Sequence, residues 1–381
     1  MIGGVSRYKG KKLRIAMAGG GTGGHVFPIK SLLEWIEKKP QYMQRIDKIY
    51  RFGSSKSLED TICNSLEIET LPAGKQGGKL EIDFIPILSG KYRRETIWKS
   101  RYKNIRDIFL FIAGFFQSLF RLLRYRINVV FCKGGYVALP VVLAAALLHR
   151  KIIVHESDTH AGLVNKIASR FATKIFTGFD NVLPHAKTIG QILSNEILIT
   201  QMSEIKNPNK TQVLVVGGSQ GSKRLYQTFL HILEAGPELQ SEFEFYIVLG
   251  LLNHEMSTQF DKFPNVHIYG FITQKQMGEL YAIGDITITR GGTTSLAEQK
   301  LYNMKQIIIP IPWTHDQYDN AQWYVDHYKD IMINQRDVAF EKKLMSALIK
   351  LRNFKKKEQK KDKQALISHA KEVIVKALLS L

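Results

Sequence analysis

Cysteine is scarce in this chain of 381 residues: its two cysteines, Cys63 and Cys132, lie far apart in sequence. Such a pair does not predict a disulfide framework, and it fits a reducing compartment. The sequence also lacks any run of about 18 to 20 apolar residues, the length that a membrane-spanning helix needs. The apolar run at residues 15–18 is too short for a signal-peptide core, and no cleavage pattern follows it. We therefore expect neither a secretion signal nor a membrane span.

Acidic residues are few in one half of the chain. Residues 1–188 hold 31 Lys and Arg against 14 Asp and Glu, a net charge of +17, whereas residues 189–352 hold 15 against 17. Residues 353–381 add 8 basic and 3 acidic residues, and the whole chain carries +20. This asymmetry indicates that a polyanion or an anionic membrane lies on one side of the molecule. A generally solubilising basic surface is the alternative, but solubility does not require such segregation.

Short apolar runs alternate with segments of helical periodicity, as at residues 28–38 and 226–233. This βα alternation predicts an α/β protein with doubly wound parallel sheets. The pattern begins twice, each time with a strand that ends in a glycine-rich turn, and the length suits two domains. We therefore expect two Rossmann-like domains with a boundary near residues 188–210. The expected strands are residues 13–18, 129–132, 151–154, 174–177, 212–216, 245–249, 267–269, 286–289 and 306–309.

The first glycine-rich turn, residues 19–25, reads Gly-Gly-Gly-Thr-Gly-Gly-His. It follows a strand and opens a helix that we expect to have Pro28 in its first turn. Glycines let the backbone approach an anion, and a helix N-terminus offers it unpaired N–H groups. The Lys-Ser/Thr ending of a P-loop is missing, which disfavours ATP hydrolysis. The pattern predicts a phosphate site, and a tight turn without a ligand is the alternative.

The second turn, Gly-Gly-Ser-Gln-Gly at residues 217–221, also follows a strand and precedes a helix. It adds the hydroxyl of Ser219 as a donor to phosphate oxygens. Two such turns, one in each domain, predict two phosphate-bearing ligands that face each other across a cleft.

Further motifs occur in a specific order along the chain, and with them the sequence closely resembles the MurG-type enzymes of peptidoglycan synthesis over about residues 13–340. These enzymes are undecaprenyldiphospho-muramoylpentapeptide β-N-acetylglucosaminyltransferases. The motifs are the two glycine-rich turns, Gly-Gly-Tyr at 134–136, His-Glu-Ser-Asp at 155–158, Gly-Leu at 162–163 and Asn-Lys at 165–166.

The resemblance implies a GT-B fold and an inverting glycosyltransferase that needs no cofactor. N-acetylglucosamine would move from UDP-N-acetylglucosamine to the 4-hydroxyl of the muramoyl sugar of lipid I, giving lipid II. The acceptor domain would be residues 1–188 with a final helix, about 364–381, that crosses back to it. Residues 189–352 would form the UDP-sugar domain, and residues 353–363 a basic connecting segment. The expected location is peripheral, on the cytoplasmic face of the cell membrane, with a cell-wall synthesis complex as a candidate partner.

The donor site implied by the resemblance lies in the second half. Glu298 would bind the ribose hydroxyls, because a carboxylate can accept two hydrogen bonds from a vicinal diol; a solvated helix acid is the alternative. Ile272 would contact the base; a buried core pair is the alternative, and it explains Phe271 nearly as well. Arg290 could face the donor phosphates or pair with a carboxylate. The second turn contributes Ser219, Gln220 and Gly221, and the hexose hydroxyls would be held by Asp316 and Gln317, supported by Asn320.

Inverting transfer requires a base that deprotonates the attacking hydroxyl. His25 is the leading candidate, although it could instead bind the acceptor diphosphate, and Glu156 is the second. No Asp-x-Asp motif stands in a suitable loop, so we expect no obligatory metal ion. The second turn and its helix dipole would stabilise the departing UDP. His155 would help to shape the cleft, and the expected acceptor-binding residues are Gly21, Thr22, Gly23, Gly24, Tyr136 and Asn165.

Membrane contact has its own pattern. Residues 91–106 carry seven Lys and Arg and one Glu, residues 108–120 are rich in Phe, Leu and Ile, and Arg121, Arg124 and Arg126 follow. A basic cluster beside an apolar segment suits shallow docking on anionic lipid. A buried core helix with a solvated basic flank is the alternative. By resemblance, Gly90, Lys91, Arg93 and Arg94 lie in the acceptor-side loop.

One departure from the family pattern lies at residues 190–193, which read Gly-Gln-Ile-Leu where an Asn-Pro-Val-Arg stretch is common. The arginine that would contact a phosphate is therefore missing. Two other functions stay open: a transferase of the same fold acting on another lipid, and a non-catalytic subunit that binds a nucleotide sugar at the membrane. Nucleic-acid binding is disfavoured, because the basic half contains no recognised module or aromatic platform.

Overall fold

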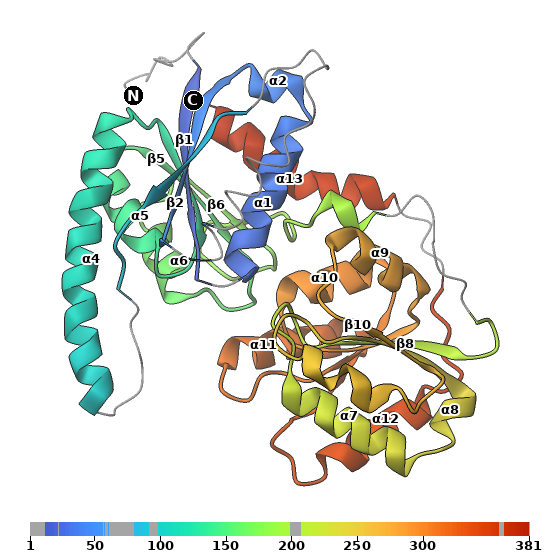
Figure 1. The fold of residues 1–381 in the computed structure, drawn as a ribbon. Coiled ribbons are helices and arrows are strands. Elements are labelled where there is room, and N and C mark those ends of the chain that lie inside the picture. The colour runs from blue at the N-terminus through green and yellow to red at the C-terminus, as the bar shows by residue number, and fades with distance from the viewer. Residues whose placement is uncertain are drawn as a thin grey trace. The chain divides into compact units, whose positions relative to one another are not determined.

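The computed structural model describes residues 12–21, 23–55, 57, 60, 80–90, 98–198, 207–357 and 362–380. The chain divides into two compact units. Unit 1 comprises Met1–Ile192 with Ile367–Leu381, and unit 2 comprises Leu193–Leu366. Each unit contains a parallel sheet with helices packed on it (Figure 1).

Unit 1 contains a seven-stranded sheet in the order β3-β2-β1-β4-β5-β6-β7, and all of its pairings are parallel. The central strands are almost wholly apolar because helices cover both of their faces. The strands are β1 (Leu13–Gly19), β2 (Ile46–Gly53), β3 (Ile82–Pro86), β4 (Val129–Gly134), β5 (Lys151–Glu156), β6 (Lys174–Thr177) and β7 (Lys187–Thr188).

Two apolar clusters hold the helices of unit 1 against its sheet. One joins α1 (Gly23–Glu37) and α13 (Lys363–Leu379) to the sheet, and the other joins α4 (Trp98–Arg124), α5 (Ala138–Leu147) and α6 (Leu163–Ser169). The short helix α2 (Pro40–Met43) follows α1.

The C-terminal helix returns to the first unit, as the resemblance led us to expect. Ile374, Val375 and Leu378 of α13 are fully buried in the same cluster as Leu32 of α1. The guanidinium of Arg45 donates a hydrogen bond of 2.6 Å to the carbonyl oxygen of Leu379. The last helix is therefore an integral part of the core of unit 1.

Unit 2 contains a six-stranded parallel sheet in the order β10-β9-β8-β11-β12-β13. Its strands are β8 (Thr211–Val216), β9 (Phe243–Val248), β10 (Val266–Tyr269), β11 (Ile286–Thr289), β12 (Lys305–Ile308) and β13 (Ile331–Met332). Its helices are η1 (Asn195–Ile197), α7 (Lys223–Ala235), α8 (Leu239–Glu242), η2 (His254–Phe260), α9 (Gln274–Ile283), α10 (Thr293–Leu301), α11 (His315–Tyr328) and α12 (Phe340–Lys350).

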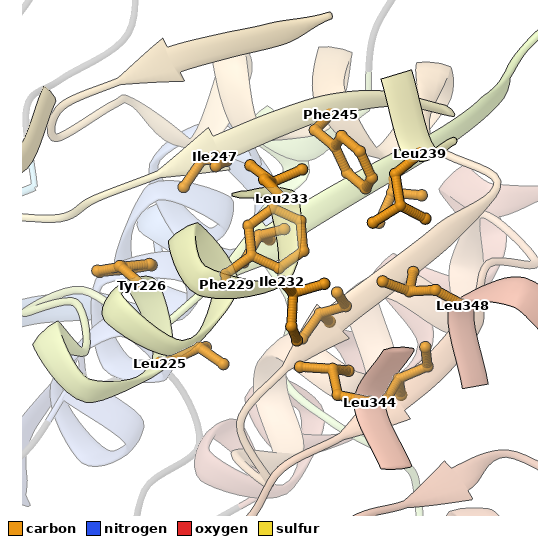
Figure 2. Close-up of a cluster of buried hydrophobic side chains, with 14 of the residues drawn as sticks. Leu225, Tyr226, Phe229, Ile232, Leu233, Leu239, Phe245, Ile247, Leu344 and Leu348 are labelled. Carbon is orange, nitrogen blue, oxygen red and sulfur yellow. The ribbon is translucent and has the colours of Figure 1, made fainter. Parts of the chain in front are cut away.

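The core of unit 2 lies between α7, α12 and the sheet. Phe229 and Ile232 of α7 point toward Phe245 of β9 on one side and toward Leu344 and Leu348 of α12 on the other (Figure 2). The rings of Phe229 and Phe245 meet edge to face with centroids 5.0 Å apart. This packing holds the helix that follows the second glycine-rich turn against the sheet.

The α/β class and the nine expected strands are confirmed, with strand ends that differ by at most two residues. One expectation about the first helix is wrong. Helix α1 begins at Gly23, so Pro28 lies in its second turn. The hydrogen bond that proline cannot donate would have reached the carbonyl of Gly24. Gly24 is exposed, so water can satisfy that carbonyl.

Candidate functional site

Both glycine-rich turns lie where the strand order of a sheet reverses. In unit 1, β1 has β2 on one side and β4 on the other, and in unit 2, β8 lies between β9 and β11. Ligands of open parallel sheets bind outside the carboxyl ends of the strands at such a switch point. The first turn follows β1 and the second follows β8, so each unit presents its turn at the expected place for a ligand.

In unit 1 the turn after β1 packs closely on the turn after β4. A Cβ atom on Gly135 would lie 2.1 Å from the carbonyl oxygen of Gly20, and one on Gly21 would lie 2.6 Å from the ring of Tyr136. Gly21 and Gly135 also have φ angles of 89° and 82°, which disfavour any other residue. Gly21 and Tyr136 are therefore brought together. Thr22 lies outside the described residues, and Gly23 and Gly24 form the start of α1.

The imidazole of His25 lies beside the end of β4. A Cβ atom on Gly134 would lie 3.1 Å from the Nε2 atom of His25 and 3.0 Å from the Nδ2 atom of Asn165. Burial, followed by the charges of Lys133 and Arg51, lowers the pKa of His25 to about 3. The free protein therefore holds a neutral imidazole at neutral pH, which is the form that can accept a proton.

Two buried cations flank the end of β1. Arg51 in β2 donates hydrogen bonds to the carbonyl oxygens of Gly19 at 2.6 Å and Met17 at 3.3 Å. Lys133 at the end of β4 donates one of 2.6 Å to the hydroxyl of Ser157. Our sequence reasoning missed both residues. The available signal was a repeat: a basic residue followed by two glycines ends a strand at 133–135 and again at 290–292.

Glu156 organises the loop that follows β5. Its Oε1 atom accepts hydrogen bonds from the backbone N–H groups of Ser157 at 2.7 Å and Asp158 at 3.0 Å. Its Oε2 atom accepts from the backbone N–H of Gly162 at 3.0 Å and from Asn165 Nδ2 at 2.9 Å. Four donors therefore converge on this buried carboxylate, and the loop and Asn165 depend on its staying in place.

Residues 190 and 191 make hydrogen-bond contacts with the end of β5 and the residue that follows it. His155 is fully buried, so it does not line an open cleft, and its Nε2 atom lies 3.0 Å from the carbonyl oxygen of Gly190. Gln191 donates a hydrogen bond of 2.7 Å to the carbonyl oxygen of Ser157. Where the family pattern has an arginine nearby, this chain therefore has an amide contact with the loop after β5.

In unit 2 the loop after β9 supports the second turn. The carbonyl oxygens of Ser219 and Gln220 accept hydrogen bonds from the N–H groups of Leu251 at 3.1 Å and Leu252 at 3.3 Å. A Cβ atom on Gly221 would lie 1.9 Å from the carbonyl oxygen of Leu249. The side chains of Ser219 and Gln220 are exposed, so the turn is held through its backbone and its outer face is open to a ligand.

Arg290 follows β11 directly and is only 9% exposed. Its Nη1 atom donates to the carbonyl oxygen of Ile309 and to the Gln335 side chain, both at 2.9 Å, and its Nη2 atom donates to the Ser222 hydroxyl. Burial lowers the pKa of Arg290 to about 10, so it stays charged. No carboxylate in the described part of the chain bonds to it, so its charge has only neutral partners there.

Gln317 and Asn320 join the loops after β11 and β12. The Oε1 atom of Gln317 accepts hydrogen bonds of 3.1 Å from the N–H groups of both Gly291 and Ile311, and Asn320 donates one of 3.2 Å to the carbonyl oxygen of Gly291. The NH₂ group of Gln317 has no partner among the residues that the structure describes. The exposed Asp316 precedes it in the first turn of α11. Gln317 and Asn320 thus both bond to Gly291, the residue that follows Arg290.

Glu298 in α10 is not a solvated helix acid, because it is only 5% exposed. Its Oε2 atom accepts a hydrogen bond of 3.0 Å from the hydroxyl of Tyr281, and burial raises its pKa to about 7. Phe271 is 57% exposed and Ile272 is half-buried, so this pair does not belong to the core.

Comparison with known proteins covers both units. Residues 15–177 match the N-terminal domain of glycosyltransferase family 28, and residues 212–378 match its C-terminal domain. The chain is 31% identical over 338 residues to the UDP-N-acetylglucosamine--N-acetylmuramyl-(pentapeptide) pyrophosphoryl-undecaprenol N-acetylglucosamine transferase of Lachnospira eligens. The aligned residues cover 85% of this chain and 87% of the relative. The chain belongs to glycosyltransferase family 28. The enzyme of the same name from Staphylococcus aureus is 32% identical over 327 residues, which cover 82% of this chain and 83% of the relative.

The family fold is also seen in solved structures. The crystal structure of MurG from Acinetobacter baumannii matches with a TM-score of 0.68 at 20% identity, over 97% of this chain and all of that one. The MurG-type resemblance and the two-domain GT-B fold are thereby confirmed. Within the described residues, no group of three His, Cys, Asp or Glu side chains is placed to hold a metal ion.

Proposed function

We propose that this family 28 chain transfers N-acetylglucosamine from UDP-N-acetylglucosamine to the 4-hydroxyl of the muramoyl sugar of lipid I, producing lipid II. One observation carries the proposal: identity above 30% extends across both units to relatives named for this reaction. The geometry of the two switch points supports it, because each holds a glycine-rich turn and a buried cation.

Unit 2 supplies a donor site. Arg290 and the second turn would bind the diphosphate, Glu298 the ribose, Ile272 the uracil, and Gln317 with Asp316 the hexose. The free NH₂ group of Gln317 supports this role, since its carbonyl oxygen is already occupied by two backbone N–H groups. As the bond from the sugar to UDP breaks, Arg290 and the N-terminus of α7 would stabilise the negative charge on the departing diphosphate.

Unit 1 supplies the acceptor site and the base. His25 would accept the proton of the 4-hydroxyl while that oxygen bonds to the anomeric carbon and UDP leaves from the opposite face. Two observations favour His25 over Glu156 as this base. The imidazole is neutral and half-buried beside the glycine turns, whereas both oxygens of Glu156 already accept hydrogen bonds from the loop.

Radiolabelled UDP-N-acetylglucosamine and a short-chain lipid I analogue test the proposal directly. A labelled disaccharide lipid is the expected product. If UDP-N-acetylglucosamine binds but no product forms, the acceptor is a different lipid. If the donor does not bind, the chain is not a transferase, and the non-catalytic function takes its place.

The pH dependence of donor binding tests the assignment of Glu298. We expect UDP to bind more weakly as the pH falls below 7, because a protonated carboxyl group is a poorer acceptor for the ribose hydroxyls. The same pKa shift makes the unliganded fold lose stability as the pH rises from about 4.5 to 7, because the folded state retains a proton that the unfolded chain releases. Calorimetry with UDP from pH 5.5 to 8.5 measures the first effect.

Glu298→Gln should remove this dependence while keeping the size of the side chain. The exposed Glu255 provides the control, and Glu255→Gln should leave the pH profile unchanged. A UDP affinity that stays constant across this range in the wild type would exclude Glu298 as a ribose ligand.

We also propose that α4 docks unit 1 on the anionic inner surface of the cell membrane. Its exposed apolar residues recur at helical spacing and form one stripe, which we call the α4 stripe: Ile105, Ile108, Phe109, Ile112, Phe116, Phe120 and Leu123. The opposite face packs on α5 (Figure 1). The exposed Arg124 and Arg126 lie just beyond the stripe. In the described part of the chain, no helix is long and apolar enough to cross a bilayer. An apolar stripe with adjacent basic residues suits shallow insertion among anionic lipids.

A double substitution in the α4 stripe, Phe109→Ser with Phe116→Ser, should lower binding to phosphatidylglycerol vesicles by about 100-fold. Burying one phenylalanine contributes roughly 1.5 to 3 kcal/mol, which is about tenfold or more for each ring. Co-sedimentation with vesicles measures the loss, and UDP affinity should not change. Phe171→Ser is the control, because Phe171 is also exposed in unit 1 but lies outside α4. Equal vesicle binding by the double variant would contradict the docking proposal.

A further inference from the structure

The ends of β4 and β11 carry the same three-residue pattern. Lys133 is followed by Gly134 and Gly135, and Arg290 is followed by Gly291 and Gly292. Each of these strands is the neighbour, across the switch point, of a strand that ends in a glycine-rich turn: β4 pairs with β1, and β11 pairs with β8. The two cations therefore occupy topologically equivalent positions in the two units.

Both cations are buried with neutral partners. Lys133 is 1% exposed, and its ammonium group has three N–H donors. Within the described residues its single hydrogen-bond partner is the hydroxyl of Ser157. A buried charge without a paired opposite charge costs several kcal/mol. Such an arrangement is expected where an anionic ligand supplies the missing charge.

The charged groups around Lys133 leave an excess of positive charge. Burial lowers the pKa of Lys133, whereas the charges of Glu156 and Asp158 raise it, and neither carboxylate forms a hydrogen bond to it. The four donors on Glu156 already compensate much of that carboxylate's charge. Arg51 adds a second buried cation on the other side of β1. The carboxyl end of β1, which leads into the first glycine-rich turn, therefore has a buried cation on each side of it.

We propose that Lys133 is an anion-binding residue of the acceptor site, where it binds the diphosphate of a lipid diphosphate as its counterpart Arg290 binds that of the donor. The inference rests on the function proposed above and names a residue for it. An ammonium group is a compact point charge that suits phosphate oxygens without requiring a fixed fork geometry.

Lys133 also offers a substitute for the arginine that is missing at residues 190–193. Gln191 bonds to the backbone carbonyl of Ser157, and Lys133 bonds to the hydroxyl of the same residue. The positive charge thus reaches the loop after β5 from strand β4 instead of from the chain segment at 190–193. Occupation of the site by a diphosphate would also raise the pKa of His25, because the anion offsets the cations that lower it.

The kinetic test is Lys133→Met. We expect the KM for the lipid I analogue to rise about 10- to 100-fold, which corresponds to the loss of one charged hydrogen bond, and the KM for UDP-N-acetylglucosamine to stay within twofold. Lys133→Arg should restore part of the acceptor affinity. The control is Lys300→Met, which removes a partly buried lysine paired with Asp330 in unit 2 and should leave the acceptor KM unchanged. An unchanged acceptor KM in a folded Lys133→Met variant would overturn the inference.

A binding measurement separates this inference from the proposed reaction. The protein is saturated with UDP to fill the donor site and is then titrated with inorganic pyrophosphate in a calorimeter. We expect the wild type to bind pyrophosphate and Lys133→Met to bind it at least tenfold more weakly. Equal affinities, or no binding by the wild type, would refute the role of Lys133. If the wild type binds pyrophosphate through Lys133 but makes no disaccharide lipid, the failure lies in the proposed reaction instead.

Discussion

Replacing His25 with alanine should lower kcat by about 100- to 10,000-fold, the range that a positioned general base contributes. The imidazole lies beside Gly134 and Asn165 at the switch point of unit 1, and it is neutral in the free protein. Without it, water must take the proton of the attacking hydroxyl. The affinity for UDP should not change, because the proposed donor residues all belong to unit 2. Steady-state transfer to a lipid I analogue and calorimetry with UDP measure the two quantities.

The matched control for this prediction is His369→Ala, because His369 is exposed on α13 in the same unit. It should retain full activity. The alternative base, Glu156, is tested with Glu156→Gln, which should destabilise the loop after β5 because an amide replaces an oxygen that accepts backbone hydrogen bonds. A His25→Ala variant that keeps kcat within a few-fold, beside a folded Glu156→Gln variant that loses it, would transfer the role to Glu156.

The pH profile tests whether the imidazole of His25 titrates between pH 5 and 8. With its pKa near 3, His25 stays neutral in the free protein from pH 5 to 8, so it produces no acidic limb in kcat/KM over that range. Any loss of kcat/KM below pH 7 should come from Glu298 and disappear in Glu298→Gln. A limb between pH 5 and 8 that disappears in His25→Gln would show that His25 titrates in this range, contrary to the burial seen here.

The strands that could be predicted from the sequence are those whose side chains are apolar on both faces, such as β4 and β8. Strand β2 was missed because Asp47, Lys48 and Arg51 interrupt its pattern, and all three charges are used in tertiary contacts, Asp47 with Arg14 of β1. Lys48 pairs with Asp83 of β3, and Arg51 bonds to the carbonyls at the end of β1. Charges that are satisfied by neighbouring strands cannot be distinguished from loop residues in a sequence.

Helix α4 shows a second limit. Its apolar segment could equally have been a core helix, and only the structure shows which side is buried. The buried face carries Asp107, Gly114 and Ser118, and a Cβ atom on Gly114 would lie 1.8 Å from the carbonyl oxygen of Leu88. The large apolar side chains of the α4 stripe point away from this contact. Large apolar residues such as Leu122 also pack inward, but the α4 stripe stays exposed on the other face, and such an exposed apolar patch is typical of an interaction surface.

The proposed functional residues also differ in how far the sequence reveals them. Motif residues such as His25, Gln317 and Asn320 could be named from local sequence, because the chemistry of their motifs is local. The buried cations Arg51 and Lys133 could not, since a lysine or an arginine in a strand gives no sign of its burial until the neighbouring strands are placed. The repeat of a basic residue before two glycines was visible, but it acquires meaning only when β4 and β11 are seen to occupy equivalent places.

Arg290→Met should weaken UDP binding by about 10- to 100-fold, because hydrogen bonds to charged groups contribute roughly 1.5 to 3 kcal/mol. The substitution also leaves the carbonyl of Ile309, the amide of Gln335 and the hydroxyl of Ser222 without their donor. Some loss of stability is therefore expected, and thermal unfolding will detect it. The comparison that isolates the phosphate contact is made with uridine, which lacks the diphosphate.

If Arg290 acts on the diphosphate, uridine should bind to the wild type and to Arg290→Met with the same affinity, while UDP loses most of its advantage over uridine. If the substitution only disturbs the loop after β11, uridine and UDP should weaken together. The exposed Arg352 supplies the control, and Arg352→Met should change neither affinity. Because Arg290 has three neutral partners and no carboxylate partner among the described residues, its charge has no structural use that a neutral donor could not serve. The diphosphate proposed to bind at the second turn would give it one.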